Sequence, residues 1–372
     1  MGALTGLRIA DFSRVLAGPY ATMLLGDMGA EVIKVERPEV GDDTRSWGPP
    51  FDAGHRATYF QSVNRNKRGI TADLSTEFGR KRALELIATC DVVVENFSVG
   101  TMEKFGLGYD TLSLMYPGLI YCSISGFGSS ESARRLPGYD LLVQALSGLM
   151  SITGPDADHP TKVGVALIDV TAGLHAALGI VAALYHRNGD CLGQKIEVNL
   201  LSSALSGMVN QSGAYAGASV TPTAMGNAHP SIAPYEVYKA NDVHIVIAVG
   251  NDAQFVKLCQ ILGIGVDAAA KFGSNVQRVL HRTELNALIA PIFASNDGAH
   301  WVSECTRVGV PAGPINDVAA AVALAEELGL KPVVTMTDPR DQSISRTIAN
   351  PIDFSKTPVE YHLGPPALGI DN

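Results

Sequence analysis

The fold of this chain is decided near its start, where residues 7–35 read LRIADFSRVLAGPYATMLLGDMGAEVIKV. Residues 7–12 form a short apolar run that is typical of a buried strand. Apolar residues at helical spacing follow over residues 18–28, and a second strand is predicted over residues 31–35. A strand, a helix and a strand in this order form the unit from which parallel sheets are built. The stretch therefore predicts an α/β fold.

The same alternation continues along the chain. A helix is predicted over residues 76–89, and further strands over residues 92–95, 119–124 and 195–199. Polar or glycine-rich residues follow the strands, as in Ser13-Arg14, Arg37-Pro38, Asn96-Phe97 and Ser125-Gly126-Phe127-Gly128. Ligands of open α/β sheets bind beyond the carboxyl ends of the strands, so these segments are the first candidates for a site.

A stretch rich in Gly, Ala, Thr and Pro interrupts the pattern at residues 216–234 and marks a domain boundary. We expect a large domain of residues 1–220 plus 331–372 and a smaller α+β domain of residues 221–330. The small domain carries predicted helices near residues 252–262, 283–294 and 299–308.

Composition narrows the class of protein. The chain has 372 residues, of which 46% are hydrophobic and 17% charged, so it can bury a sizeable core. Its formal net charge is −9, whereas non-specific binding to nucleic acid needs an excess of cations. The 5 cysteines show no CxxC spacing, which disfavours a disulfide framework and a structural zinc site. We expect a soluble, cytoplasmic protein with no nucleic-acid partner.

The sequence indicates neither a secreted protein nor a membrane protein. The amino terminus lacks the basic region, apolar core and cleavage site of a signal peptide. The most apolar long stretch, residues 171–185, contains Gly173, His175 and Gly179 and is shorter than the roughly 18 residues that span a bilayer. We predict a buried helix there and no membrane partner.

The first strand–helix turn argues against a dinucleotide site. Residues 11–19 read DFSRVLAGP, and a single Gly followed by Pro does not form the GxGxxG turn that lets the backbone approach a pyrophosphate. Glu36 stands where an acidic residue would meet a ribose, but the next residue, Arg37, is a cation suited to a phosphate.

Asp169, directly before the apolar helix, allows two compatible interpretations. It can cap the helix, because an Asp carboxylate accepts hydrogen bonds from the free N–H groups of a first turn. It can also be a nucleophile, because a helix N-terminus favours the ionised form that covalent carboxylate catalysis needs. No spacing of His, Cys or acidic residues indicates a metal site, and His175 fits a core role better than a ligand role.

Several segments together carry a resemblance to a known family. They are LRIADF at 7–12, AGP at 17–19, GAEVIKVE at 29–36, GDDTR at 41–45, NKR at 66–68, VENF at 94–97, SGFG at 125–128 and VPAGP at 310–314. In order and spacing the chain resembles the class III CoA transferases, also called the CaiB/BaiF family. The resemblance implies a large Rossmann-like domain built from both chain ends, a smaller middle domain and an interlocked homodimer.

The resemblance also implies a reaction. In this family an aspartate at the position of Asp169 attacks the thioester of an acyl-CoA and forms a mixed anhydride. The released CoA thiolate converts the anhydride into an aspartyl-CoA thioester, from which CoA passes to an acceptor carboxylic acid. Acyl-CoA is thus a substrate, and no tightly bound cofactor is expected.

Contacts to CoA are implied at matching positions. They are Val15, Leu16, Ala17, Arg37, Ala72, Asp73, Leu74, Ser75, Asn96, Phe97, Lys104, Tyr139 and Asp140. Some members carry a basic residue just before the Tyr-Asp pair, where this chain has Pro137 and Gly138. His229 lies in the region that matches a loop over the aspartate, and is a candidate contact to the acyl group.

Two alternative functions remain open. The family looks to contain α-methylacyl-CoA racemases as well, but these need a histidine base where this chain has Tyr139, and a phenol with a pKa of about 10 is a poor base. A non-catalytic acyl-CoA-binding protein is the other alternative. Solvent deuterium entering the α-carbon would identify a racemase, and CoA affinity without turnover would identify a binding protein.

Overall fold

The computed structural model describes residues 1–372, with the side chain of residue 268 excepted. The chain divides into two compact units. Unit 1 comprises Met1–Leu149, Lys162–Thr221 and Lys331–Asn372, and unit 2 comprises Met150–Thr161 and Pro222–Leu330.

One segment is grouped differently from the sequence-based expectation. Residues 150–161 were expected in the large domain but belong to unit 2. The reason is local pairing, since the N–H of Gly226 donates to the carbonyl of Gly154 at 3.1 Å. The other expected boundaries, near residues 220 and 331, lie next to the ends of the two units.

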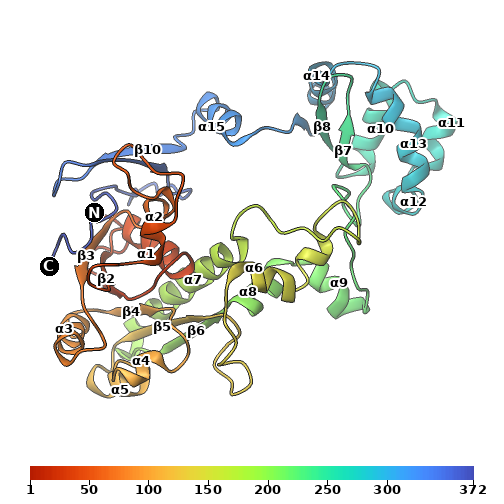
Figure 1. The fold of residues 1–372 in the computed structure, drawn as a ribbon. Coiled ribbons are helices and arrows are strands. Elements are labelled where there is room, and N and C mark those ends of the chain that lie inside the picture. The colour runs from red at the N-terminus through yellow and green to blue at the C-terminus, as the bar shows by residue number, and fades with distance from the viewer. The chain divides into compact units, whose positions relative to one another are not determined.

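Unit 1 is built on a six-stranded parallel sheet (Figure 1). Its strands are β1 (Arg8–Asp11), β2 (Glu31–Glu36), β3 (Lys67–Thr71), β4 (Val92–Glu95), β5 (Ile120–Ser125) and β6 (Lys195–Asn199). They lie in the order β3-β2-β1-β4-β5-β6, with every neighbouring pair parallel. All carboxyl ends therefore share one edge, and the order reverses between β1 and β4, where such sheets form a ligand crevice.

The prediction of an α/β fold with a parallel sheet is confirmed. Five of its strands lie within one residue of the predicted ranges, but β3 was missed. Its sequence, KRGIT, opens with two cations and carries no apolar run. Lys67 is nevertheless fully buried, because its charge is paired with Asp11 inside the fold.

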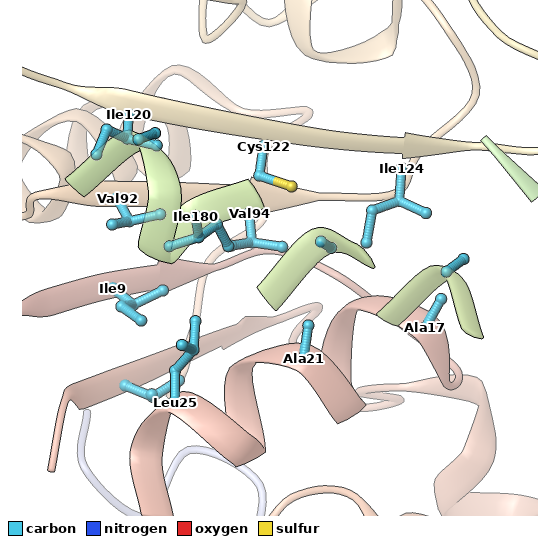
Figure 2. Packing of buried hydrophobic residues seen from close by; sticks show 14 of the residues in the cluster. Ile9, Ala17, Ala21, Leu25, Val92, Val94, Ile120, Cys122, Ile124 and Ile180 are labelled. Carbon is cyan, nitrogen blue, oxygen red and sulfur yellow. The ribbon is translucent and has the colours of Figure 1, made fainter. Parts of the chain in front are cut away.

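Helices cover both faces of this sheet. Those of unit 1 are α1 (Ala17–Asp27), α2 (Thr58–Ser62), α3 (Glu77–Ile87), α4 (Thr101–Lys104), α5 (Tyr109–Met115), α6 (Asp140–Leu146), α7 (Leu167–Asp190), α8 (Leu200–Gly207) and α9 (Asn210–Ala218). Successive residues of a strand point to opposite faces, and β4 shows this clearly. Val92 and Val94 pack with α1 and α7 (Figure 2), in a core that α8 also joins, whereas Val93 packs with residues of α3 and α5.

Helix α7 lies at the centre of the first of these cores. Its inward face carries Ile168, Ala172, Ala176 and Ile180, four residues apart, and each is at most 2% exposed. The small alanines let α7 pack closely on α1 and on the sheet. The helix was predicted from residue 171, but it begins at Leu167, so Asp169 lies inside its first turn.

By length and composition alone, α7 also passes for a membrane-spanning helix. It has 24 residues and a mean hydropathy of 1.9 over its most apolar window, of which 39% is buried. The sequence-based estimate was shorter because Gly173 and Gly179 were treated as interruptions. Both glycines instead fit close contacts, since a side chain at Gly173 would meet the backbone of Ala17 at 2.6 Å.

The end of the chain returns to unit 1. Strands β10 (Val333–Thr337) and β11 (Ile344–Ile348) form an antiparallel pair. The buried Arg65 side chain donates to the carbonyl of Ile348 at 2.8 Å and forms an ion pair with Asp27 at 2.7 Å. Farther on, the amide N–H of Gly69 donates to the Asp371 carboxylate at 2.8 Å.

Unit 2 has its own small sheet and core. Strands β7 (Tyr235–Lys239), β8 (His244–Ala248) and β9 (Ala312–Pro314) are antiparallel. Its helices are α10 (Asp252–Ile261), α11 (Val266–Lys271), α12 (Asn275–Leu280), α13 (Arg282–Phe293), α14 (Gly298–Val308) and α15 (Val318–Glu327). Tyr238, Phe293 and Trp301 pack at the centre, where the indole N–H of Trp301 donates to the carbonyl of Phe293 at 2.8 Å.

Candidate functional site

A cavity of about 520 Å³ opens at the carboxyl edge of the unit 1 sheet. This size lies within the range of small-molecule sites. Its walls come from the segments after β1, β4 and β5, from the loop before α6 and from the first turn of α7. The lining residues that the sequence proposed as site residues are Val15, Leu16, Ala17, Asn96, Phe97, Tyr139 and Asp169.

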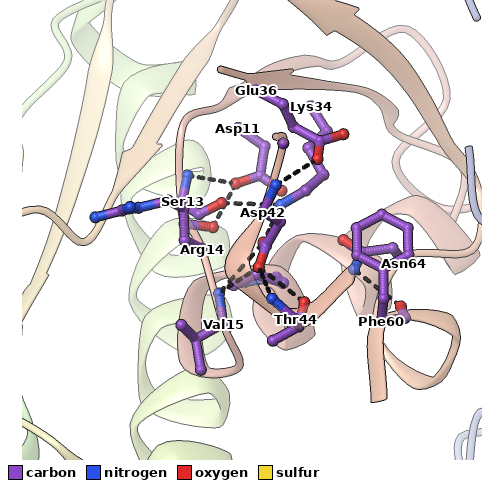
Figure 3. Close-up of polar contacts among 12 residues, drawn as sticks. Asp11, Ser13, Arg14, Val15, Lys34, Glu36, Asp42, Thr44, Phe60 and Asn64 are labelled. Atoms are coloured by element: carbon purple, nitrogen blue, oxygen red, sulfur yellow. Dashed lines mark hydrogen bonds and ion pairs between the residues drawn. The ribbon is translucent and has the colours of Figure 1, made fainter. Parts of the chain in front are cut away.

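The β1–α1 turn forms one wall and is held in an uncommon conformation. Val15 has a φ of 68°, a region that β-branched residues rarely adopt. Its backbone N–H points at Asp42 and lies 3.3 Å from each carboxylate oxygen (Figure 3). Asp42 is buried, so this contact fixes the turn from inside the protein.

Two buried lysines support this turn. The Lys34 ammonium donates to Asp42 and to the carbonyl of Ser13, both at 2.9 Å, and Lys34 is fully buried. Although burial opposes ionisation, the neighbouring Lys34 holds the pKa of Asp42 at about 2. Lys67 donates to Asp11 at 3.0 Å, and burial lowers its pKa to about 8 against the pull of that carboxylate.

Asn96 connects the β1–α1 turn to the segment after β4. Its side-chain oxygen accepts the backbone N–H of Arg14 at 2.8 Å, and its amide group donates to the carbonyl of Arg14 at 2.7 Å. The guanidinium of Arg14 then lies 5.1 Å from the centre of the Phe97 ring. Asn96 therefore shapes the cavity wall through the backbone of Arg14.

Asp169 reaches the cavity from the first turn of α7. The N-cap of this helix is Ala166, and Asp169 makes no capping hydrogen bond, so the prediction that Asp169 caps the helix is wrong. Asp140, at the start of α6, performs that task, because its carboxylate accepts the N–H groups of Ile168 at 2.9 Å and Asp169 at 3.2 Å.

Burial and electrostatics make the Asp169 carboxylate unusually basic. Burial raises its pKa to about 7, and the negative charge of Asp140 adds to the rise. The helix N-terminus was expected from the sequence to favour the ionised form, but burial and the charge of Asp140 outweigh this effect. Asp169 is therefore only partly ionised near neutral pH.

Tyr59 in α2 belongs to the same surroundings and was not identified from the sequence. Burial raises its pKa to about 12, and the charges of Asp169, Asp140 and Asp42 contribute. Its ring meets that of Trp47 edge to face, with 5.3 Å between ring centres. No motif marks Tyr59, because α2 lies between β2 and β3 and reaches Asp169 only through the fold.

Three arginines line the cavity, namely Arg14, Arg134 and Arg135. Arg14 forms an ion pair with Asp43 at 3.2 Å, and Asp43 also pairs with Arg37 at 2.7 Å. Arg134 and Arg135, in the loop before α6, also line the cavity and form no ion pair within 4.0 Å among the described residues. Neither was identified from the sequence, since both lie in an irregular loop without motif spacing.

Other proposed site residues lie outside this cavity. Arg37 is linked to it through Asp43, and Asp140 through the first turn of α7. The loop of Ala72, Asp73, Leu74 and Ser75 follows β3, and Lys104 ends α4 with its side chain exposed. His229 belongs to unit 2, where its ring meets that of Tyr235 at 5.3 Å.

The chemistry of the cavity is that of a basic carboxylate beside an anion-binding wall. A half-buried carboxylate that is partly ionised near neutral pH can attack an activated acyl group. The arginines that line the cavity can hold phosphate groups. Among the described residues, no group of three or more His, Cys, Asp or Glu side chains is placed to bind a metal ion.

Comparisons with known proteins point to one family. The model of CoA-transferase family III matches residues 4–372. The succinate–glutarate CoA-transferase of Agrobacterium fabrum is 41% identical over 378 residues, which cover 98% of this chain and 93% of the relative. The succinyl-CoA:mesaconate CoA-transferase of Haloarcula hispanica is 42% identical over 327 residues, which cover 86% of this chain and 82% of the relative.

A solved structure agrees with these matches. It is that of a CAIB/BAIF family protein from Brucella suis, which is 40% identical to this chain. The two superimpose with a TM-score of 0.86 over 100% of this chain and 97% of the other.

Proposed function

The chain belongs to CoA-transferase family III, and from that premise we propose that Asp169 is its nucleophile. The enzyme is a CoA-transferase, which moves CoA between an acyl-CoA and a carboxylic acid. One observation supports the role of Asp169 above all: its partly ionised carboxylate lines a cavity together with arginines and the β1–α1 turn.

The proposed first half of the reaction transfers CoA to the enzyme. A carboxylate oxygen of Asp169 attacks the thioester carbonyl carbon, the C–S bond breaks, and CoA leaves as a thiolate. This gives a mixed anhydride between Asp169 and the donor acid. The thiolate then attacks the Asp169 carbonyl carbon, so the donor leaves as a carboxylate and an aspartyl-CoA thioester remains.

The second half repeats these steps with the acceptor. The acceptor carboxylate attacks the aspartyl thioester carbon, which releases the CoA thiolate and forms a new anhydride. The thiolate attacks the acceptor's carbonyl carbon, and the Asp169 carboxylate is the leaving group. Every bond broken is replaced by one formed, and no proton, oxidant, water or bound cofactor is consumed. The partial burial of Asp169 favours this exchange over hydrolysis of the intermediates.

For CoA itself, we propose an extended binding path. Residues Val15, Leu16, Ala17, Phe97 and Tyr139 of the cavity would hold the part nearest the thioester. Arg134 and Arg135 carry cations that lack acidic partners and are suited to phosphates. Arg37, Lys104 and the loop of residues 72–75 would contact the remainder outside the cavity.

For the acids, we propose small dicarboxylates. The names of the two relatives above mention succinate or succinyl-CoA, glutarate and mesaconate, all dicarboxylic. We place His229 as a contact to the acyl group. Its Nδ1 lies 3.1 Å from the N–H of Ser231 and accepts from it, which leaves the other ring nitrogen as a hydrogen-bond donor.

At the level of the assembly, we propose a Rossmann-like large domain and an interlocked homodimer. The strand order of unit 1 is that of dinucleotide-binding sheets. On α7, Leu174, Leu178, Val181 and Tyr185 form an exposed apolar stripe that a second copy would cover. Unpaired cysteines suit a reducing compartment, and we propose a cytoplasmic, non-membrane location.

The decisive experiment traps the enzyme-bound intermediate. Purified enzyme is mixed with succinyl-CoA, quenched with hydroxylamine and digested, and mass spectrometry should find the hydroxamate on Asp169. The Asp169→Asn variant keeps the size of the side chain and should give neither adduct nor transfer to glutarate. Full transfer by that variant would refute the proposal.

The same samples separate the alternatives. A racemase would incorporate solvent deuterium at the α-carbon of a 2-methylacyl-CoA without any acceptor acid. A binding protein would retain CoA without turnover against a panel of carboxylic acids. We expect neither result, since Tyr139 occupies the position of the racemase base.

A further inference from the structure

The Asp140 carboxylate, which caps α7, is itself hydrogen-bonded to the buried side-chain amide of Gln144. Gln144 lies one turn after Asp140 in α6 and is 1% exposed. Its amide nitrogen donates to Oδ2 of Asp140 at 2.5 Å. Oδ1 of Asp140 is free to accept the N–H groups of Ile168 and Asp169. The Gln144 side chain is thus connected to the backbone of Asp169 through one carboxylate.

Gln144 also holds the segment that leads into α7. Its side-chain oxygen accepts the N–H of Val163 at 2.9 Å, and its amide nitrogen lies 3.3 Å from the carbonyl of Val165. An amide both donates and accepts, so it can meet a carboxylate, a carbonyl and an N–H at once. An ionised glutamate has no proton to donate, and methionine offers neither strong donor nor acceptor.

The first turn of α7 depends on this arrangement. The first N–H groups of a helix have no partner within the helix, and Ala166 at the N-cap offers no side chain to accept them. Asp140 supplies the missing acceptor from a neighbouring helix. Since Gln144 fixes Asp140, loss of the amide would release both the turn and the Asp169 side chain that it presents to the cavity.

We propose that Gln144 and Asp140 are positioning residues for CoA transfer, which hold the first turn of α7 so that the Asp169 carboxylate faces the substrate. The inference rests on the proposed role of Asp169 as nucleophile. Neither residue lines the cavity, so both act through Asp169 and need not touch CoA.

Asp140 has an electrostatic role in addition to its geometric one. The charge of Asp140 from α6 acts on Asp169, and the charge of Asp169 in turn raises the pKa of the Tyr59 phenol in α2. Burial is the larger cause of the raised pKa of Asp169, and Asp140 adds to it. A carboxylate with a raised pKa is a stronger nucleophile once ionised.

The first test removes the amide from Gln144. Gln144→Met keeps the length of the side chain and should slow formation of the Asp169 adduct from succinyl-CoA roughly 10- to 100-fold, as small misplacements of reacting groups do. The KM for succinyl-CoA should change less than about twofold, because the cavity wall is intact. Gln260→Met, the same change at an exposed position of α10, is the matched control and should leave both values unchanged.

The second test removes the charge of Asp140 but keeps an acceptor. Asp140→Asn should shift the acid limb of the rate of adduct formation to lower pH, because the carboxylate that raises the pKa of Asp169 is gone. A merely structural role would leave the pH profile in place. This variant tests the electrostatic role of Asp140 whether or not Gln144→Met folds.

The outcomes separate this inference from the function on which it rests. If the wild type forms no adduct on Asp169, the proposed nucleophile is wrong. If the wild type forms the adduct and Gln144→Met forms it at the same rate, the positioning role is refuted. An unchanged pH profile in Asp140→Asn refutes the electrostatic part.

Discussion

At the scale of single residues, the site depends on two kinds of charged group that line one cavity: the Asp169 carboxylate and the arginine side chains. Asp169 is half-buried next to Asp140, so the carboxylate of this proposed nucleophile is basic yet still ionises near neutral pH. Arg134 and Arg135 line the same cavity and form no ion pair with an acidic side chain among the described residues. The whole chain has a net charge of −9, whereas these cations make the surroundings of the cavity locally positive.

The ionisation of Asp169 predicts a pH dependence for the first chemical step. Only the ionised carboxylate attacks, and its pKa is about 7. The rate of adduct formation should therefore rise with pH, by roughly tenfold per unit well below the pKa, and level off above it. Rapid-quench mass spectrometry between pH 5 and 8 measures this, and a flat profile would contradict the assignment.

The unpaired arginines predict a specific loss of phosphate recognition. Replacing both Arg134 and Arg135 by Ala should raise the KM for succinyl-CoA by roughly tenfold or more, with kcat little changed, since charge-assisted hydrogen bonds contribute about 1.5–3 kcal/mol. If the pair holds the 3′-phosphate, the wild type should prefer succinyl-CoA to its 3′-dephospho form, and the variant should lose that preference. If the pair holds the diphosphate instead, the wild type should prefer succinyl-CoA to succinyl-pantetheine, and the variant should lose that preference.

The control for this pair is another exposed arginine. Arg346→Ala in β11 removes a cation that does not line the cavity and should keep both preferences. Preferences that persist in the double variant would show that the phosphates are bound elsewhere.

Some of these residues could be found from the sequence and others could not. Asp169 was identified because a family pattern and a helix start coincide there, although its local role was misjudged. The capping group is Asp140, which lies 29 positions away and meets the helix only in the fold. Tyr59, Gln144, Arg134 and Arg135 follow no spacing rule, because loops and crossing helices bring them to the site.

At the scale of elements, the β1–α1 turn shows how strain is held in place. The turn places Val15 at a positive φ, a conformation that costs energy for a β-branched residue. The Asp42 carboxylate compensates by accepting its N–H, and Lys34 neutralises that carboxylate. The turn can thus present backbone to the cavity without the glycines that dinucleotide-binding turns use.

This support predicts a large effect for a single change. Lys34→Met leaves Asp42 buried without its cation and should reduce the free energy of unfolding by about 3–5 kcal/mol. Urea denaturation at pH 7 measures the loss. Because the unpaired Asp42 carboxyl can take up a proton, we expect the loss to shrink as the pH falls toward 4. A deficit that does not change with pH would show that the ion pair is not its source.

Element boundaries followed from the sequence wherever apolar periodicity was clear. Strands β4 and β6 have the predicted bounds because their runs are short and end in polar residues. Strand β3 was missed, since its buried Lys67 reads as a surface residue until Asp11 is placed beside it. Helix α15 was also missed, and no residue in it is buried, so no inward-facing stripe marks it.

At the scale of the whole molecule, unit 1 depends on contacts between distant parts of the chain. Asp27 at the end of α1 is fully buried and accepts hydrogen bonds from Arg65, Asn66 and Asn350. One carboxylate therefore joins three segments, the last of them more than three hundred residues away. Unit 2 contains none of these groups.

These contacts predict that a substitution at Asp27 lowers the thermal stability of unit 1 and leaves that of unit 2 unchanged. Asp27→Asn leaves the Arg65 guanidinium buried without its counter-charge, a change that typically costs about 3–5 kcal/mol. In scanning calorimetry we expect a transition assigned to unit 1 to move to lower temperature while that of unit 2 stays in place. Isolated unit 2 identifies its own transition, and an equal shift of both would contradict the expectation.

The discontinuous build of unit 1 also bears on how the protein is made. A ribosome releases residues 1–149 long before residues 331–372 exist, so Arg65 and Asp27 wait for the partners that Ile348 and Asn350 provide. During that interval unit 2, whose main segment is continuous, can fold first. The need for chaperones is then greatest while the amino-terminal half has been synthesised and its carboxyl-terminal partners have not.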